Sequence, residues 1–524
     1  MGVMPAADAR TATRNDRLFF WVLGGTVLLK LAVSAAIPLT NDEAYYYQHA
    51  FHPALGYRDH PPMVAWFLYP FLLLGKSEWI IRLPSILSSA IVGLGIHSVT
   101  REHDAARARA VAILYLVSPL HILFIPYTTD TPLYLFSFLS GLFLYRAVRG
   151  EGSLRYVLSG VFLGAAFLSK YLAVFLGIAY ALFFLSARGD RRRLRGGALL
   201  FLSAAPFVAQ NVYWNWTHSW ANVLFNLLNR NVGAGFGLRN VAFHAVTQLY
   251  LITPPLLLLL YRERNGMAER VAGSPLRLFA ALFLVPAAAF AALSTVKPIG
   301  VHWTVSFYPF LYLSLIAAAG TERIAGAIRG MALFAAAHVA LLAVLLALPL
   351  PAFRHTAYYG ELVFLIEGRQ VADALKPFGE KYLFSSTSYA QAARLSYYSG
   401  THFFVFGAGS RNGRADDLWT DFRTLDGRNI LVFSKKPLDV PALAPFFDAV
   451  ESRALPVGGA RFHFLLGKGF RYGTYRDIVL RKVLRDYYTI PRVLPAGRDF
   501  FRERYFGLPA SRSPLSGGTP AGPG

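Results

Sequence analysis

The sequence predicts a polytopic α-helical membrane protein, of about 11 transmembrane helices, with a soluble α/β domain at its C-terminal end. Its 524 residues are 55% hydrophobic and only 15% charged, a composition too apolar for an ordinary soluble protein. Apolar runs long enough to cross about 30 Å of hydrocarbon recur as far as Pro349. After Ala352 the composition becomes that of a soluble domain.

The transmembrane helices are predicted from apolar runs of about 17 to 25 residues. Three of these runs, 155–169, 171–186 and 198–212, are short. Short runs indicate helices that are tilted, partly covered by protein or broken at their ends. The predicted spans are 18–38, 80–99, 110–126, 131–147, 155–169, 171–186, 198–212, 241–261, 278–294, 303–320 and 331–349.

The gaps between these spans alternate in charge. Every even-numbered gap is basic, whereas the odd-numbered gaps hold few cations and most of the other polar residues. By the positive-inside rule, this pattern predicts a cytoplasmic N-terminus and an outward-facing first gap and C-terminal domain. The first span lacks a small-residue cleavage site, so we expect it to be a retained signal anchor. An example of a basic even-numbered gap is the one after the sixth span, which contains Arg188, Arg191, Arg192, Arg193 and Arg195.

Three regions follow from this organisation. Residues 1–350 are predicted to form a transmembrane catalytic domain whose main outward loops are 39–79 and 213–240. Residues 351–510 are predicted to form a soluble periplasmic α/β domain. The low-complexity tail 511–524 is predicted to be disordered.

Local patterns within the soluble domain support an α/β fold. Strands are predicted to begin near Lys381 and Asn429, and Tyr389–Tyr398 has helical spacing with a glycine stop at Gly400. The later segment Arg471–Arg504 is basic and aromatic. It suits either a partner carrying phosphates or an anionic membrane surface, and an ordinary solvated face explains it equally well.

Several function classes are excluded or lose support. The formal charge of +23 could suggest nucleic acid, but arginines clustered between apolar spans are better explained by topology and anionic lipid. We therefore predict no nucleic-acid partner. The chain has no cysteine, which excludes disulfides, thiolate metal sites and a cysteine nucleophile. Neither a phosphate-binding P-loop, a G-x-S-x-G elbow, an H-E-x-x-H pair nor an internal repeat is found.

Polar residues suited to catalysis gather in the outward gaps. A carboxylate there can act as general base toward an acceptor, while cations and imidazoles hold a phosphate as it leaves. These groups are what displacement at a sugar carbon bound to phosphate requires. They are Asp42, Glu43, Asp59 and His60 in the first gap, Thr128, Thr129 and Asp130 in the second, Lys170 and Tyr171 in the third, Arg230 in the fourth, and Lys297 and His302 in the fifth.

Most of these residues also have an ordinary structural explanation. Tyr45 and its neighbours can form an aromatic belt at the interface, and His302 beside a tryptophan can be an interfacial residue. Lys170 can extend from a helix end toward water. Asp130 is harder to explain in this way, because a carboxylate between two apolar spans needs a partner.

Five segments in order carry a family resemblance. They are N-D-E-A-Y-Y-Y, G-Y-R-D-H-P-P, Y-T-T-D-T-P-L, L-S-K-Y-L-A-V-F and N-W-T-H-S-W. Together they resemble the bacterial branch of the protein O-mannosyltransferase family, which includes the lipid A aminoarabinose transferase and belongs to the C-type glycosyltransferase (GT-C) superfamily. In the soluble domain, S-Y-A-Q-A-A-R-L-S-Y-Y and R-A-D-D-L-W resemble the same branch.

The resemblance implies an enzyme of the bacterial inner membrane. It would be an inverting glycosyltransferase that moves a sugar from a polyprenyl-phosphate donor to a lipopolysaccharide-type (lipid A), other glycan or protein acceptor on the periplasmic side. Asp42 matches the catalytic carboxylate, with Glu43 as its neighbour, and Asp130 matches a second acidic position. His60 stands where the aminoarabinose transferase has a lysine that contacts donor phosphate, and a histidine is a weaker cation at pH 7.

The remaining candidate site residues fall into three groups. Lys170, Arg230, Lys297 and His302 are candidates, with His60, for donor-phosphate binding. Tyr45, Tyr46 and Tyr57 are candidates for shaping the substrate site. No cofactor is predicted with certainty, but some relatives bind a divalent metal near this segment, and Asp59 with a histidine is the candidate for it.

A second class of function competes with the enzyme. In a carrier or flippase for lipid-linked sugars, the same carboxylates would bind and release rather than catalyse. A transporter should place its charged residues in broken, repeated helices near mid-membrane, whereas here they lie in gaps on one side. A sensor that binds envelope glycans would leave the first-gap carboxylates without a role.

Overall fold

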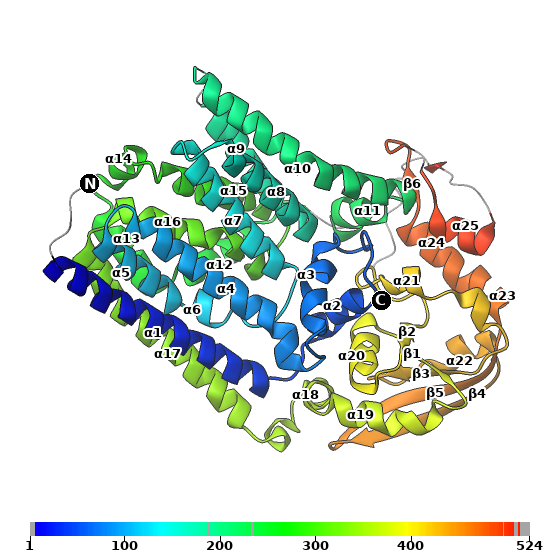
Figure 1. Cartoon of the computed structure of the whole chain (residues 1–524). Helices are drawn as coiled ribbons and strands as arrows, with labels where there is room; N and C mark the ends of the chain where they lie inside the picture. Colours follow the sequence, from blue (N-terminus) through cyan, green and yellow to red (C-terminus); the bar gives the residue numbers. More distant parts are fainter. Residues whose placement is uncertain (1–5, 187–188, 232–234, 496, 508–511, 514–524) are drawn as a thin grey trace. The chain divides into compact units, whose positions relative to one another are not determined.

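The computed structural model describes residues 6–186, 189–231, 235–495, 497–507 and 512–513. The chain forms two compact units, which are described separately (Figure 1). The first unit comprises Met1–Ile37, Trp66–Val208 and Gly233–Leu348. The second comprises Pro38–Ala65, Ala209–Val232 and Pro349–Gly524.

The first unit is helical. Within the described residues, six of its helices are long and apolar enough to cross a membrane, or seven if one bent pair counts as a single span. The chain is therefore a multi-pass membrane protein, as predicted. Its helices are α1 (Ala6–Ala36), α4 (Glu78–Arg101), α5 (Ala105–Leu116), α6 (Pro119–Ile122), α7 (Asp130–Val148), α8 (Ser153–Ser169), α9 (Val174–Leu185), α12 (Leu238–Ile252), α13 (Pro254–Glu263), α14 (Met267–Ala272), α15 (Arg277–Ser294), α16 (Tyr308–Ala318) and α17 (Thr321–Ala347), with α3 (Met63–Leu72) and α10 (Arg191–Thr217) each running from one unit into the other.

Each of the 11 predicted spans coincides with helix, but several are interrupted. The predicted span 110–126 breaks after α5, where Ser118 and Pro119 begin the short α6. The span 241–261 is the bent pair α12 and α13, which meet at 86°. At this bend Thr253 has a φ of 74°, and Pro254 begins α13 because its ring fits only the first turn of a helix.

The first outward loop contains more structure than the sequence analysis expected. Residues 39–79 were predicted as a loop, but they contain α2 (Asn41–Phe51) and most of them beyond Met63 belong to α3. Thr40 begins α2 through a capping box with Glu43: each backbone N–H is accepted by the other residue's side chain, at 2.9 and 3.2 Å. The motif Thr-x-x-Glu is a signal for a helix start.

The second unit contains a five-stranded sheet with the order β2-β1-β3-β5-β4. β1 pairs in parallel with β2 and β3, whereas β5 pairs antiparallel with β3 and β4. Gly458 and Gly459, both with positive φ, form the two-residue turn between β4 and β5. The strands are β1 (Leu383–Ser386), β2 (Phe403–Val405), β3 (Ile430–Ser434), β4 (Phe447–Val457) and β5 (Ala460–Phe470), and a second sheet pairs β6 (Ile490–Pro491) with β7 (Arg512–Ser513).

Strand β3 lies at the centre of this unit because both of its faces are covered. Ile430 and Val432 pack into one hydrophobic cluster, while Leu431 and Phe433 pack into another. Alternate side chains of a strand point to opposite faces, so a strand buried on both faces is a continuous apolar run. Besides α2, the helices of this unit are α11 (Ala221–Leu227), α18 (Tyr359–Ile366), α19 (Gly368–Leu375), α20 (Tyr389–Ser399), α21 (Asp416–Trp419), α22 (Val440–Leu443), α23 (Tyr472–Tyr475), α24 (Arg481–Tyr487) and α25 (Phe500–Phe506).

The predicted α/β fold of the C-terminal part is confirmed. Both predicted strands are present as β1 and β3, and α20 ends at Gly400, whose φ is 71°. The β4/β5 hairpin was not predicted, and most of β4 is exposed. The predicted domain boundaries stay a prediction, although the contacts group 38–65 and 209–232 with the C-terminal part. Of the predicted disordered tail 511–524, all but 512–513 lies outside the described residues.

Candidate active site

In the second unit, α2 presents one exposed carboxylate. Asp42 lies exposed in the first turn of the helix, while the residues from Glu43 to Ala50 are buried. A carboxylate at this position is favoured by the partial positive charge of the helix N-terminus. Glu43, by contrast, is fully buried and completes the capping box. Asp42 is therefore the better placed of the two to meet a substrate.

Helix α20 packs against α2 and holds it in place. The ring of Tyr45 lies 5.0 Å from that of Tyr389, and the rings of Tyr47 and Tyr397 are equally far apart. Arg394 is fully buried, and its guanidinium donates to the carbonyl of Leu365 at 2.6 Å and to that of Leu39 just before α2. The segment S-Y-A-Q-A-A-R-L-S-Y-Y therefore supports α2.

Asp59 is the centre of a buried polar network. Its carboxylate accepts hydrogen bonds from the Tyr45 hydroxyl at 2.7 Å, from Arg58 at 3.1 Å and from the backbone N–H of Arg414 at 3.0 Å. Burial alone would raise the pKa of Asp59, but Arg58, His60 and these hydrogen bonds hold it below its ordinary value. Asp59 is thus an ionised structural carboxylate.

The metal predicted as an option at Asp59 does not fit this geometry. Both of its oxygens already accept hydrogen bonds, so a metal ion would have to compete with the Tyr45, Arg58 and Arg414 donors. Among the residues that the structure describes, no group of three or more His, Cys, Asp or Glu side chains could hold a metal ion.

The three tyrosines predicted to shape the substrate site are all buried. The Tyr57 hydroxyl donates to the carbonyl of His49 or His52 and accepts from the N–H of Ala54, so it closes the turn after α2. The Tyr46 hydroxyl lies 3.4 Å from Nε2 of His60, which is half-buried. Their predicted role toward substrate stays a prediction; the contacts described here are structural.

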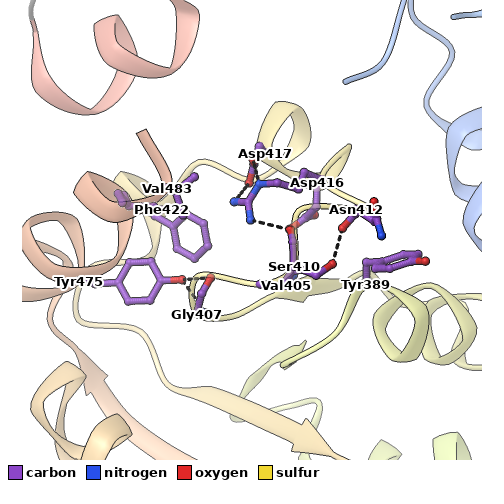
Figure 2. A pocket seen from close by; sticks show the side chains of 14 residues that line it. Tyr389, Val405, Gly407, Ser410, Asn412, Asp416, Asp417, Phe422, Tyr475 and Val483 are labelled. Carbon is purple, nitrogen blue, oxygen red and sulfur yellow. Dashed lines mark hydrogen bonds and ion pairs between the residues drawn. The ribbon is translucent and has the colours of Figure 1, made fainter. Parts of the chain in front are cut away.

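Arg414 and Asp417 extend the polar network around Asp59, and the sequence analysis did not predict a role for them. Nε and Nη2 of Arg414 donate to Asp417 at 2.7 and 3.0 Å, and its guanidinium lies 4.6 Å from the ring centre of Tyr487. A small space lined by Arg414, Asp417, Tyr475 and Gly407 (Figure 2) measures about 10 Å³, which is room for about one water molecule. The segment R-A-D-D-L-W, which starts at Arg414, was the sequence signal that could have indicated these residues. In the structure its role is packing, through the Arg414–Asp417 pair and the hydrogen bond from the Arg414 N–H to Asp59.

Protonation of His49 should couple acidity to the stability of the second unit. Nδ1 of His49 donates to the Tyr45 carbonyl at 2.8 Å, and the ring packs against Tyr57 and Trp419. Burial lowers the pKa of His49 to about 4, against smaller opposing effects of the Tyr45 carbonyl and Asp59. In the unfolded chain this histidine takes up a proton near pH 6.5, whereas in the folded protein it does so only near pH 4. The free energy of unfolding is therefore unaffected by His49 above pH 6.5 and falls between pH 6.5 and 4, by up to about 3 kcal/mol.

His49→Phe should weaken this dependence, since phenylalanine fills the same aromatic site without titrating, while His52 and His218, whose pKa burial also lowers, keep their own contributions. The check is the denaturation midpoint of the purified full-length protein at several values between pH 7 and 4.5. Asp59 does not interfere, because its lowered pKa costs stability only below its ordinary value of 3.8. Equal slopes for the parent and the variant would refute the assignment.

The first unit holds the second group of predicted residues. Asp130, at the first turn of α7, is 3% exposed, and its two oxygens accept from Nζ of Lys170 at 2.8 and 2.9 Å. Nε2 of His302 lies 3.8 Å from the same carboxylate. Nζ of Lys170 and Nζ of Lys297 lie 5.9 and 5.3 Å from the ring centre of Trp303. Lys170 therefore links Asp130 and His302 on one side to Trp303 and Lys297 on the other.

A cavity of about 340 Å³ opens at this cluster. Its polar end contains Asp130, His302 and Thr128, and its walls come from the two places where helices are broken, α5/α6 and α12/α13. Irregular backbone at membrane depth is tolerated where it lines such a cavity. The apolar walls are formed by Leu120, Leu123, Phe124, Leu251, Val305 and Phe334.

The structure thus divides the predicted site residues between the units. Asp130, Lys170, Lys297 and His302 come together in the first unit. Arg230 lies half-buried in the short helix Asn229–Asn231 of the second unit, and is not part of that cluster. The second unit also contains Asp42, Glu43, Asp59 and His60.

These features define a class of protein: a multi-pass membrane protein with an apolar cavity that ends in acidic and basic side chains, joined to an α/β domain. Residues 59–214 match the model of the family described as dolichyl-phosphate-mannose-protein mannosyltransferase. This confirms the predicted resemblance and the prediction of a glycosyltransferase. A comparison with curated protein sequences finds no match.

Two solved structures have the same fold over nearly their whole length. The crystal structure of ArnT from Cupriavidus metallidurans in the apo state has a TM-score of 0.62 at 16% identity, covering 87% of this chain and 98% of that one. The structure of the same protein bound to undecaprenyl phosphate has a TM-score of 0.61 at 16% identity, covering 85% and 97%. The predicted architecture, a polytopic helical membrane protein with a C-terminal α/β domain, is confirmed.

Proposed function

We propose that this glycosyltransferase moves a sugar, with inversion, from a polyprenyl-phosphate donor to an acceptor on the periplasmic side of the bacterial inner membrane. The observation that carries the proposal is the cavity of about 340 Å³, apolar along its walls and charged at one end. A polyprenyl phosphate has the matching chemistry, a long apolar chain with an anionic head. ArnT, which shares the fold, has been crystallised with undecaprenyl phosphate.

The charged end of the cavity is suited to a leaving phosphate. His302 lines this end of the cavity and supplies a hydrogen-bond donor, while Lys170 and Lys297 beside it supply positive charge. Such groups stabilise the charge that grows on the phosphate as the bond to the sugar breaks. Asp130 holds the Lys170 ammonium through both oxygens, so the cation is positioned before the donor arrives. In this proposal Asp130 acts through Lys170 rather than on the sugar itself.

The proposal gives Asp42 the role of general base. It removes the proton from the acceptor hydroxyl or amine, which attacks the anomeric carbon from the side opposite to the phosphate. One bond to the acceptor forms as the bond to the phosphate breaks, so the configuration inverts. Exposure of Asp42 and its place at a helix N-terminus support this role, because a base must reach the acceptor and stay ionised at neutral pH.

For the acceptor, we favour an anionic glycolipid of the lipopolysaccharide type over another glycan or a protein. Arg476, Arg481 and Arg485 lie exposed in the α23–α24 region, paired with Asp477 or Asp486. Exposed ion pairs contribute little stability, so these arginines can exchange their partners for the phosphates of an acceptor at small cost.

Filling the cavity should block use of the donor. Leu123 lines the cavity and is 38% exposed, so Leu123→Trp would occupy part of the space that the prenyl chain needs. We expect at least about a tenfold loss of kcat/KM for the donor, equivalent to about 1.4 kcal/mol. Leu182→Trp is the matched control, since Leu182 is 53% exposed on α9 and lies outside the cavity lining. Equal activity of the two variants would reject the cavity as the donor site.

The absence of natural cysteines allows a direct test of orientation. Asn265 and Thr401 are both exposed, in an even-numbered gap and in the C-terminal part respectively. In intact spheroplasts, a membrane-impermeant maleimide should label Thr401→Cys fully and Asn265→Cys only after permeabilisation. The reverse pattern would invert the proposed topology.

A further inference from the structure

A second cavity in the first unit has no role in the proposed transfer. It measures about 320 Å³ and lies among the C-terminal ends of α7 and α9 and the start of α15. Asp130 begins α7 and Val148 ends it, so the two cavities are separated along that helix by roughly 27 Å. The second cavity is therefore at the opposite end of the membrane-spanning unit from the Asp130 cluster.

The lining of this cavity carries a strong positive charge. Arg149, Arg193 and Arg277 all contribute to it, and no aspartate or glutamate is present among the described residues that line it. These arginines come from three separate basic gaps of the sequence, which the fold brings to one place. Guanidinium groups bind phosphate oxygens through pairs of parallel N–H donors.

The ion pairs around the cavity leave much of this capacity unused. Nη1 of Arg149 donates to Glu102 at 2.6 Å and to the Tyr145 hydroxyl at 3.2 Å, and Nε of Arg193 pairs with Asp190 at 3.2 Å. A guanidinium has five donors, so in the described part of the chain these contacts occupy a minority of them. All the pairs are partly exposed, and Arg277 is exposed to solvent.

The walls beside the arginines are apolar. Val148, Phe183 and Leu278 line the cavity, and the Arg193 guanidinium lies 5.9 Å from the ring centre of Phe183. On α9, Leu182 and Leu185 on either side of Phe183 are about half exposed. In a span at the edge of the hydrocarbon layer, such leucines face lipid. A ligand that satisfies both parts of this cavity must combine an anionic phosphate with apolar chains.

We propose that this cavity binds an anionic phospholipid of the surrounding membrane, with its headgroup phosphate held by Arg149, Arg193 and Arg277. Its acyl chains pack along α9 beside Phe183. A bilayer offers this ligand at high local concentration, and basic groups between membrane helices are suited to it. The site is independent of the donor cavity and of the transfer reaction.

The test uses the purified full-length protein and its Arg193→Gln/Arg277→Gln double variant. Arg329→Gln is the matched control: it removes an exposed arginine from α17 that does not line the cavity. Native mass spectrometry would titrate each protein with dioleoylphosphatidylglycerol and with dioleoylphosphatidylcholine, and a thermal-shift series would add inorganic phosphate alone. Thermal unfolding without added lipid confirms that the variants are folded.

We expect the parent and Arg329→Gln to bind phosphatidylglycerol in preference to phosphatidylcholine, and the double variant to lose about tenfold or more in affinity for it. Equal binding by the double variant and the control would overturn the proposal, as would a parent that does not distinguish the two lipids. Stabilisation by inorganic phosphate equal to that by phosphatidylglycerol would show a simple anion site and overturn the lipid assignment. If the parent protein shows the expected preference for phosphatidylglycerol but no sugar transfer, the result counts against the proposed function and leaves the lipid site standing.

Discussion

Replacing Asp42 by Asn should lower the turnover number for sugar transfer by about 10²- to 10⁴-fold, the range that a positioned general base supplies. Asparagine keeps the shape and the hydrogen-bonding capacity of the side chain but cannot accept the proton of the acceptor. Because Asp42 is exposed, its neutralisation should leave expression and folding unchanged. The measurement is the initial rate of transfer by purified protein at saturating donor, with thermal unfolding recorded in parallel.

Two further variants make this result specific. Asp448→Asn removes another exposed carboxylate, which lies on β4 and pairs with Arg471. This variant should keep the turnover number of the parent. Glu43→Gln decides whether the neighbouring carboxylate takes part in the chemistry, because glutamine can complete the same capping box. Near-normal turnover of Asp42→Asn would refute the assignment of the base.

The second large effect is expected at the buried pair of Asp130 and Lys170. Lys170→Gln leaves the Asp130 carboxylate buried without its ammonium partner, which should destabilise the protein by about 3 to 5 kcal/mol. The double variant Asp130→Asn/Lys170→Gln is neutral at both positions and can keep a hydrogen bond between the two amides. Its thermal unfolding midpoint should therefore lie well above that of Lys170→Gln.

Donor use separates the structural part of this pair from its functional part. If Lys170 holds the donor phosphate, the double variant should recover stability but not transfer. Recovery of both would show that the pair serves folding only. A midpoint of Lys170→Gln equal to that of the parent would show that the carboxylate does not depend on this ammonium group.

Much of the membrane unit was predictable from composition. Each predicted span coincides with helix, because an apolar segment in lipid must satisfy its own backbone hydrogen bonds, and a helix does this within one segment. The breaks were harder to predict. The 86° bend between α12 and α13 depends on Thr253 and Pro254, and the sequence analysis treated that proline-containing run as one continuous span.

The candidate site was predictable by residue type but not by arrangement. Asp130 was expected to need a partner, and Lys170, 40 residues away, provides it. A carboxylate and a lysine in separate gaps carry no sequence signal of their pairing. The structural role of Asp59 was also hidden, since its partner Arg414 lies 355 residues further along the chain.

Helix α2 shows the opposite case, in which a local signal was present and overlooked. The segment from Thr40 to Glu43 forms a capping box, yet its acidic and aromatic residues suggested a loop. The rings of Tyr45 and Tyr47 pack against α20, so these residues contribute apolar surface to the core as well as polar hydroxyl groups. Asp42 is then the exposed carboxylate of a helix whose residues from Glu43 to Ala50 are buried.

The most direct test of the proposed function is the transfer of radiolabel from a panel of polyprenyl-phosphate sugars by the purified protein, with membrane extract as the acceptor. We expect label to move from at least one donor with the parent protein and not with Asp42→Asn. That result would establish the reaction, identify the sugar and mark the acceptor for isolation. Absence of transfer from every donor, with polyprenyl-phosphate binding retained by both proteins, would contradict the proposal and favour a carrier of lipid-linked sugars.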